Sequence, residues 1–311
     1  MNNNTQKYFS DLVGQDSVKK KLSFYLDAFR KTSQAPFLLM AGGAGLGKTE
    51  FSKAFAKNLC EKEGKIGFIE INCSTIKNNE EFFEQMLPEI FIHENVCVLF
   101  DECHALPKDL TMAFLTIFNS ESSHHKTFEW NGMSYVFNFK RQTFVFATTE
   151  TDKIFPPLKD RFSSVDFEAY NEQELGEIIK ICAPDIEFDD DCLKEVASTI
   201  RCNARSAVKR AKEISLYCGA KESNHFSLDN FRDLCDNIGI LPFGLTNTEK
   251  QVLEILNNCG SVTLTGLSAK LGLSSTAVRR DHELYLLRKN LIEIDGKRKI
   301  THNGRQVCKL L

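Results

Sequence analysis

Short apolar runs alternate with stretches of helical periodicity over the first half of the chain. The apolar runs are rich in Phe, Ile, Val and Leu, as strands covered on both faces are. Glu80–Leu87 and Lys108–Phe118 have helical character and lie between these runs. Alternation of this kind predicts a parallel α/β sheet. The predicted strands are Phe37–Ala41, Gly67–Asn72, Val96–Phe100 and Phe144–Ala147.

The pattern changes near Asn171. Apolar side chains then recur at helical spacing in three successive stretches, which predicts a small helical bundle. The helical pattern breaks at Leu241-Pro242-Phe243-Gly244. The apolar positions that carry this periodicity are Leu175, Ile178, Ile179 and Cys182, then Leu193, Val196, Ala197 and Ile200, then Ala204, Ala207, Val208 and Ala211.

The last part of the chain has the pattern of three helices followed by a hairpin. Thr246 and Glu249 have the spacing of a capping box at the start of the first helix. Asp295-Gly296 is a two-residue turn signal between two short apolar runs. This order is that of a winged helix, with helices predicted at Thr246–Asn257, Thr263–Leu271 and Ser274 or Ser275 to Arg288. We therefore expect three domains, an α/β core over residues 1–170, a helical lid over 171–242 and a winged helix over 243–311.

Composition narrows the class of protein. Of the 311 residues, 42% are apolar and 26% are charged, which is typical of a globular chain and excludes extensive disorder. No apolar run is long enough to span a membrane, and the first residues do not resemble a signal peptide. We therefore expect a soluble cytoplasmic protein. The 11 cysteines include no C-x-x-C pair, which favours reduced core residues over a zinc or disulfide framework.

Charge is unevenly distributed along the chain. The net charge is −3, but the segment from Gly244 to Leu311 has 11 Lys and Arg against 6 Asp and Glu, a net of +5. The remainder is therefore −8. A basic terminal domain on an acidic body favours a local nucleic-acid surface.

A phosphate-binding loop follows the first predicted strand. Gly42-Gly43-Ala44-Gly45-Leu46-Gly47-Lys48-Thr49 matches G-x-x-x-x-G-K-[ST] and precedes an apolar-periodic helix. Its glycines let backbone N–H groups close around phosphate oxygens, and the helix N-terminus adds positive potential. Lys48 would reach the β- and γ-phosphates of ATP, and Thr49 would hold Mg²⁺. The nucleotide-contacting set in this region is Gly42, Gly43, Ala44, Gly45, Leu46, Gly47, Lys48, Thr49 and Glu50.

Acidic and polar residues follow two further predicted strands. Asp101 and Glu102 end the strand that starts at Val96, and beside a phosphate-binding loop they predict a Mg²⁺ ligand and a base that polarises water. Alone, a strand that ends in Asp-Glu is a common surface turn. Thr148 and Thr149 come after the fourth strand, so we expect them at the same sheet edge. Arg161 follows a Pro-Leu turn and is either an arginine finger donated to a neighbouring subunit or a surface ion pair.

These motifs resemble the AAA+ ATPases, and specifically the RuvB-type Holliday-junction branch-migration motors, over nearly the whole chain. Phe9–Gln15 is similar to the family's opening box near the adenine, which implicates Leu12 and Val13. Asp101-Glu102-Cys103-His104 resembles the family's DEIH-type Walker B motif. Thr149 resembles the sensor-1 residue. The resemblance also implies that Arg161 is an arginine finger, that Arg205 is the sensor-2 residue, and that Tyr170 lies against the adenine.

The chain departs from the family at several positions. Gly42-Gly43-Ala44-Gly45 replaces a G-P-P-G start, and Glu150 stands where an arginine is usual. Cys202-Asn203-Ala204 replaces G-T-P, and Lys297-Arg298-Lys299 replaces P-R-G-R in the wing. None of these changes removes a catalytic group. The chain thus resembles a divergent member of the family, and the resemblance implies that this chain keeps ATPase activity.

Two surfaces are candidates for binding macromolecules. Asn131-Gly132 predicts a hairpin turn between aromatic residues, and RuvB-like proteins dock RuvA through a hairpin in this place. The alternative is a hairpin whose aromatic side chains pack on their own domain. The candidate partner-binding residues are Phe128, Trp130, Met133 and Tyr135. In the winged helix, the candidate DNA-phosphate contacts are Arg279, Arg280, Lys297, Arg298, Lys299 and Arg305, the alternative being a solvated basic face or a protein-docking wing.

The resemblance implies an ATP-dependent DNA motor that migrates Holliday junctions as a ring of six subunits. One alternative is an AAA+ clamp-loader-like or helicase-loading ATPase, which would hydrolyse ATP without migrating junctions. Another is a nucleotide-gated winged-helix regulator, in which ATP only sets assembly.

Overall fold

The computed structural model describes residues 8–59, 67–93, 95–119, 124–201 and 203–311. It divides into two compact units, the first comprising residues 1–174 with 203–205 and the second residues 175–202 with 206–311. The division of the second unit at residue 242 stays a prediction.

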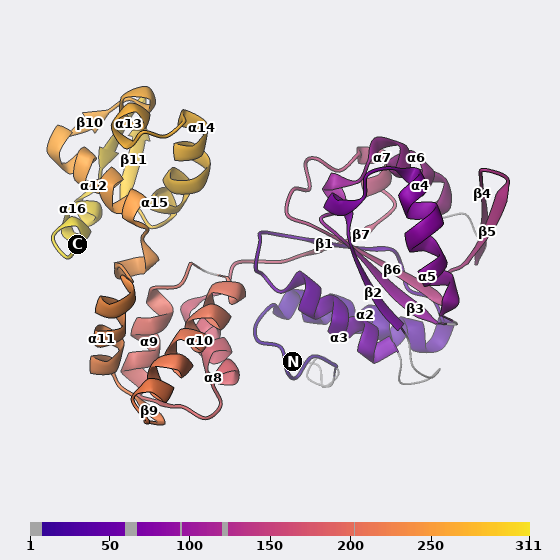
Figure 1. The fold of residues 1–311 in the computed structure, drawn as a ribbon, viewed down its shortest axis with the longest axis horizontal. Helices are drawn as coiled ribbons and strands as arrows, with labels where there is room; N and C mark the ends of the chain where they lie inside the picture. Colours follow the sequence, from indigo (N-terminus) through magenta and orange to yellow (C-terminus); the bar gives the residue numbers. More distant parts are fainter. Residues whose placement is uncertain (1–7, 60–66, 94, 120–123, 202) are drawn as a thin grey trace. The chain divides into compact units, whose positions relative to one another are not determined.

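The first unit is built around a five-stranded sheet (Figure 1). Its order is β2-β3-β6-β1-β7, and every neighbouring pair is parallel. The predicted α/β class with a parallel sheet is therefore confirmed. The edge strand β7 was missed, because its sequence Ser-Ser-Val-Asp carries one buried apolar side chain. The strands are β1 (Leu38–Ala41), β2 (Gly67–Asn72), β3 (Val96–Asp101), β6 (Gln142–Thr148) and β7 (Ser163–Asp166).

Helices cover both faces of this sheet (Figure 1). α2 (Asp16–Thr32) and α3 (Lys48–Leu59) lie on one face. The other face is covered by α4 (Asn79–Glu81), η2 (Phe82–Met86), α5 (Leu87–Ile92) and α6 (Lys108–Ile117). Phenylalanine dominates the second interface, where Phe82, Phe100 and Phe114 have ring centroids 5.1–6.0 Å apart. Three short helices complete the unit, η1 (Cys73–Thr75), η3 (Cys103–Ala105) and α7 (Pro156–Lys159).

A two-stranded antiparallel hairpin, β4 (His125–Trp130) with β5 (Met133–Asn138), stands beside the sheet. Asn131 and Gly132 form its turn with φ of 48° and 75°. Two successive positive φ angles are those of the predicted type I′ turn. Phe128 pairs with Tyr135 and Trp130 pairs with Met133 across the strands.

The second unit contains the helical lid and the winged helix. The lid consists of α8 (Glu172–Cys182), α9 (Asp190–Ser198), α10 (Ala204–Ala220) and α11 (Leu228–Ile238), with a short parallel pair, β8 (Glu187–Phe188) and β9 (His225–Phe226). α8 and α10 each begin with residues that belong to the first unit. The three predicted helical stretches thus correspond to α8, α9 and α10.

The winged helix follows η4 (Pro242–Gly244). Thr246 and Glu249 form the predicted capping box at the start of α12, with backbone-to-side-chain distances of 2.8 and 3.2 Å. The hairpin β11–β12 gains a third strand, β10, and the terminal helix α16 was not predicted. The elements are α12 (Asn247–Cys259), β10 (Ser261–Val262), α13 (Leu264–Leu271), α14 (Ser275–Ala277), η5 (Val278–Glu283), α15 (Leu284–Arg288), β11 (Ile292–Asp295), β12 (Lys297–Ile300) and α16 (His302–Cys308). None of the helices in the described residues has the length and apolarity that crossing a membrane requires.

Candidate nucleotide site and DNA-binding surface

The phosphate-binding loop connects β1 to α3 and depends on its glycines. Gly42, Gly45 and Gly47 have φ of 153°, 75° and 93°, which side chains other than hydrogen rarely permit. A Cβ on Gly42 would lie 2.8 Å from Phe167 Cβ, and one on Gly45 would lie 2.9 Å from Asn203 Oδ1. The loop therefore has a backbone shape and a tight fit to its neighbours that only glycine allows.

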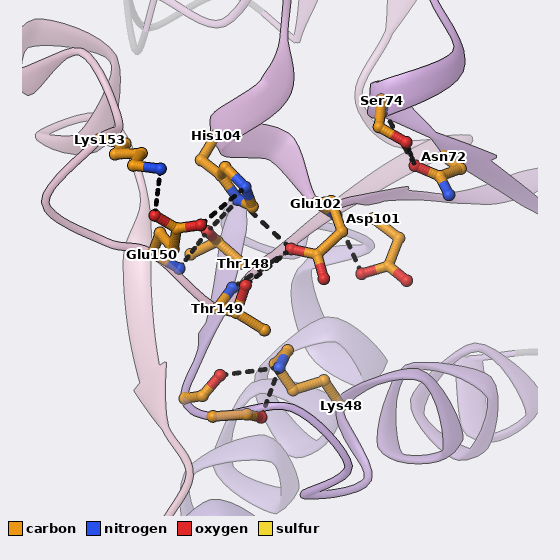
Figure 2. A network of polar contacts seen from close by, with 12 residues as sticks. Lys48, Asn72, Ser74, Asp101, Glu102, His104, Thr148, Thr149, Glu150 and Lys153 are labelled. Atoms are coloured by element: carbon orange, nitrogen blue, oxygen red, sulfur yellow. Dashed lines mark hydrogen bonds and ion pairs between the residues drawn. The ribbon is translucent and has the colours of Figure 1, made fainter. Parts of the chain in front are cut away.

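Lys48 begins α3 and turns its ammonium group back over the loop. Its Nζ donates hydrogen bonds to the carbonyl oxygens of Gly42 at 2.8 Å and Gly43 at 2.9 Å (Figure 2). Burial lowers the pKa of Lys48, while the nearby carboxylates of Glu102 and Asp101 favour its charged form. A desolvated ammonium held at this loop is suited to binding phosphate oxygens.

Asp101 ends β3, and Glu102 starts the turn that follows. The backbone N–H of Glu102 donates to Asp101 Oδ1 at 2.9 Å. Glu102 has φ of 51° and ψ of 45°, a left-handed conformation that costs a residue with a Cβ roughly 1–2 kcal/mol. This turn leads directly into η3, so that Glu102 and His104 extend toward each other (Figure 2).

The end of β6 meets the end of β3 at the same sheet edge, as predicted. Thr149 donates from Oγ1 to Glu102 Oε2 at 3.0 Å, and its backbone N–H points to the same oxygen at 3.4 Å. Thr148 is fully buried, and its Oγ1 lies 2.9 Å from His104 Nδ1. The structure thus brings the proposed sensor residue Thr149 into contact with the proposed base.

Three side chains beside Glu102 were not among the predicted site residues. His104 Nδ1 lies 3.3 Å from Glu102 Oε2, and His104 Nε2 lies 3.6 Å from Glu150 Oε1. Glu150 also pairs with Lys153 (Figure 2). The position of His104 in the Walker B motif and the unusual glutamate at position 150 were the available signals, but neither indicated a contact.

The fit of Mg²⁺ can be judged from the donor set. Thr49 lies in the first turn of α3, and Asp101 lies at the end of β3, so both offer the oxygen ligands that Mg²⁺ prefers. The loop in front of them is shaped for phosphate, and phosphate oxygens complete the coordination of Mg²⁺ in such sites. These residues suit a Mg²⁺–nucleotide complex.

The N-terminal segment is tied to the chain beyond β7. Gln15 is 7% exposed; its amide donates to the carbonyl of Glu168 at 2.7 Å, and the Glu168 N–H donates back at 3.1 Å. Leu12 and Val13 are half-buried, and Lys19 donates to the Leu12 carbonyl. Tyr170 donates to the Leu46 carbonyl at 3.1 Å, and its burial raises its pKa. Tyr170 thus packs on the phosphate-binding loop.

Arg205 belongs to the first unit, together with Asn203. Its backbone N–H donates to the Gly45 carbonyl at 3.2 Å, and its positive charge lowers the pKa of Lys48. The predicted sensor-2 residue is therefore close to the loop.

Arg161 lies just after α7, and its hydrogen bond is local. Its guanidinium donates to the Pro157 carbonyl within its own turn. Its Nε is buried without a hydrogen-bond partner in the described part of the chain. No contact joins Arg161 to Lys48, Asp101 or Glu102, all of which are described. Arg161 also forms no ion pair with any residue in the described ranges, so the alternative of a surface ion pair is not supported.

In the winged helix, the prediction that Arg298 contacts DNA is wrong. Arg298 is 8% exposed, and its guanidinium donates to both oxygens of Glu283 at 2.6 and 3.1 Å. The two form a buried ion pair between β12 and η5. Arg280 pairs with Asp281 and Lys299 lies 3.8 Å from Asp295, but both pairs are solvent-accessible. Arg279, Lys297 and Arg305 are exposed.

In the structure, the aromatic side chains of the β4–β5 hairpin pack on their own domain. Phe128 and Trp130 stack on Phe83 with centroids 5.2 and 5.1 Å apart. Tyr135 donates to the Phe83 carbonyl at 3.2 Å. These three aromatic side chains are half-buried against their own domain, as the alternative interpretation expects, and their contact with a partner stays a prediction. Met133 lies on the same face, directly opposite Trp130, and is 46% exposed.

Two parts of the chain match models of known protein families. Residues 38–169 match the ATPase family associated with various cellular activities (AAA), and residues 242–309 match the RuvB C-terminal winged helix domain. The chain is 26% identical over 294 residues to the Holliday junction branch migration complex subunit RuvB of Pseudothermotoga lettingae, covering 91% of this chain and 82% of that protein. It is equally similar to RuvB of Bdellovibrio bacteriovorus, with coverages of 92% and 87%.

Solved structures share the fold. The Thermotoga maritima RuvB Holliday junction branch migration motor matches with a TM-score of 0.74 and 23% identity, covering 96% of this chain and 95% of that one. The fold is therefore shared along nearly the whole length of both chains. The chain is a divergent relative of RuvB, with an AAA ATPase core and a RuvB-type winged helix.

Proposed function

We propose that the chain is an ATP-hydrolysing DNA motor that migrates Holliday junctions in recombination and repair. One observation carries this proposal: Lys48 lies near the carboxylates of Glu102 and Asp101, and Thr149 donates to Glu102, in a chain that also matches the RuvB C-terminal winged helix domain. Relatives that match along most of the chain are named as subunits of the branch migration complex.

The geometry supports a division of roles at the nucleotide. Lys48 and the loop N–H groups bind the β- and γ-phosphates of ATP. Thr49 and Asp101 would hold Mg²⁺, which when bound neutralises phosphate charge. Glu102 accepts a hydrogen bond from the attacking water and takes up its proton, as a general base does. Thr149 keeps Glu102 in place, Arg205 senses the γ-phosphate, and Leu12, Val13 and Tyr170 border the adenine.

The proposed assembly is a ring, a hexamer by resemblance, in which Arg161 completes the site of a neighbouring subunit. The absence of contacts from Arg161 to its own site residues fits this role. A positive charge supplied in trans stabilises the charge that develops on the transferred phosphate. A RuvA-like partner and duplex or four-way DNA are the proposed binding partners. Arg279, Arg280, Lys297, Lys299 and Arg305 are the proposed phosphate contacts.

The decisive measurement is the steady-state ATPase rate with and without four-way-junction DNA. We expect DNA to stimulate turnover, and Lys48→Ala, Glu102→Gln and Arg161→Ala each to reduce it by about 10²-fold or more. An equal mixture of Arg161→Ala and Glu102→Gln subunits should regain activity, because mixed interfaces combine an intact base with an intact finger. Turnover that DNA leaves unchanged would instead favour a loader or a winged-helix regulator.

A further inference from the structure

The contacts of Glu102 are confined to one of its two carboxylate oxygens. Oε2 receives the Thr149 hydroxyl at 3.0 Å and lies 3.3 Å from His104 Nδ1. Among the described residues, no hydrogen bond or ion pair involves Oε1. Holding one oxygen from two sides fixes the plane of the carboxylate and leaves the other oxygen available to a water molecule.

His104 is itself held on both edges of its ring. Nδ1 lies 2.9 Å from Thr148 Oγ1, a hydroxyl that also accepts the Glu150 N–H at 3.0 Å. Nε2 faces Glu150 Oε1 at 3.6 Å (Figure 2). The His104 side chain is 15% exposed, whereas that of Glu150 is 41% exposed. The imidazole thus lies between a site carboxylate and a second carboxylate at the surface.

Glu150 has a cationic partner of its own. Lys153, three residues further on, pairs with Glu150 Oε2. The two oxygens of Glu150 are therefore divided between Lys153 and His104. The pair lies at the surface, with the side chains of Glu150 and Lys153 41% and 57% exposed.

We propose that His104 and Glu150 are positioning residues for ATP hydrolysis, which set the orientation of Glu102 through its Oε2. His104 holds the carboxylate, and Glu150 fixes the ring of His104 from the opposite edge. Neither residue touches the nucleotide in this scheme. The inference rests on the proposed role of Glu102 as the base, and it concerns a glutamate that this chain has in place of the family's usual arginine.

Four variants distinguish the contact of His104 with Glu102 from its contact with Glu150. Asparagine places its amide near the position of Nδ1, so His104→Asn retains the contact to Glu102 and loses that to Glu150. Glutamine reaches the position of Nε2, so His104→Gln has the opposite effect. His104→Ala removes both contacts. Glu150→Gln keeps the shape and removes the charge, and Asp152→Asn, which makes the same charge change at an exposed residue nearby, is its control.

The readouts are kcat and KM for ATP in the full chain with junction DNA. We expect His104→Ala and His104→Gln to lower kcat by about 10- to 100-fold while KM stays within about twofold, because positioning acts on the chemical step. His104→Asn should recover most of the lost kcat. Glu150→Gln should lower kcat by about two- to fivefold, and Asp152→Asn should leave it unchanged.

Several results would overturn the proposal. They are an undiminished kcat in His104→Ala, an effect on KM alone, equal losses in His104→Asn and His104→Gln, or a similar loss in Asp152→Asn. If the His104 variants do not fold, the comparison of Glu150→Gln with Asp152→Asn decides. Glu102→Gln is measured in parallel: if it retains full turnover, the role of Glu102 fails, whereas if it alone is inactive, only the roles of His104 and Glu150 fail.

Discussion

Arg298 illustrates how the same cationic side chain can bind DNA or hold a domain together. It lies in a run of three basic residues on the wing, where its neighbours Lys297 and Lys299 remain accessible. In β12, however, alternate side chains point to opposite faces, and Arg298 is the one that points inward to Glu283. Strand alternation, rather than charge, decides which of the three side chains reaches solvent.

We expect Arg298→Ala to lower the free energy of unfolding of the winged helix by about 3–5 kcal/mol, because it leaves the buried Glu283 carboxylate unpaired. Urea denaturation followed by circular dichroism measures this change. Lys297→Ala serves as the control. It should change stability by about 0.5 kcal/mol or less and reduce the salt dependence of DNA binding by about one unit of slope. A stable Arg298→Ala protein with weakened DNA binding would restore the original interpretation of Arg298.

The nucleotide site was predicted from short motifs and from the ends of neighbouring strands, but the contact between His104 and Glu150 was not predicted. Lys48, Thr49, Asp101 and Glu102 lie in two short motifs whose spacing reflects local backbone geometry. His104 and Glu150 are 46 positions apart and meet because β3 and β6 are parallel neighbours that end at one edge. No local pattern encodes that contact, since it depends on strand order and on the left-handed turn at Glu102.

At the scale of elements, the hairpin β4–β5 is more closely attached to its domain than its sequence suggested. Phe83 from η2 lies against three aromatic side chains of the hairpin. The sequence predicted the turn and the strands, because Asn-Gly and alternation are local signals. It could not predict which face is covered, since the covering residue comes from a segment about 50 positions earlier.

Phe83→Ala is expected to destabilise the first unit by about 3–5 kcal/mol, because Phe83 is fully buried at the centre of this cluster. Trp130 is the only tryptophan in the chain, so its fluorescence reports on the hairpin alone. We expect a red shift of its emission in Phe83→Ala, as the indole becomes hydrated. Val136→Thr, at an exposed position on the opposite face of the hairpin, should leave the emission unchanged and change the stability by about 0.5 kcal/mol or less. An unshifted emission in Phe83→Ala would mean that the stacking is absent in solution.

The elements with the clearest apolar patterns were predicted, whereas the long helices α2 and α11 and several short peripheral elements were not. The four central strands carry dense apolar runs, and α8, α9 and α10 carry clear helical periodicity. β7 and α16 were missed because each has few buried apolar positions, one in β7 and Val307 in α16. Their formation depends on a neighbouring strand or helix that is already in place.

At the scale of the whole molecule, Arg201 links the lid to the winged helix within the second unit. It lies between α9 and α10, and its Nε donates to the Gly244 carbonyl at 2.9 Å. Its guanidinium pairs with the fully buried Glu249 and lies 4.3 Å from the ring centroid of Tyr285. His282 lies 3.8 Å from the same carboxylate. One side chain thus joins the segment before α10 to α12 and α15.

We expect Arg201→Met to lower the free energy of unfolding by about 3–5 kcal/mol, because Glu249 loses its main counter-charge in a buried site. Differential scanning calorimetry should then show the winged helix melting separately from the lid. Arg232→Met is the matched control, since Arg232 forms an exposed pair with Asp229 that contributes about 1 kcal/mol or less. A single undisplaced transition in Arg201→Met would show that this contact does not couple the two parts.

The left-handed backbone conformation at Glu102 lowers protein stability, while the carboxylate at this position serves the proposed catalysis. For folding alone, glycine would be the better residue at this turn, since it adopts positive φ without steric cost. The proposed chemistry requires a carboxylate there, so every functional copy of this site carries the strain. A chain selected only for thermal stability would therefore drift toward glycine at position 102 and lose its activity. Persistence of glutamate at this turn in functional descendants would be a record of selection for hydrolysis.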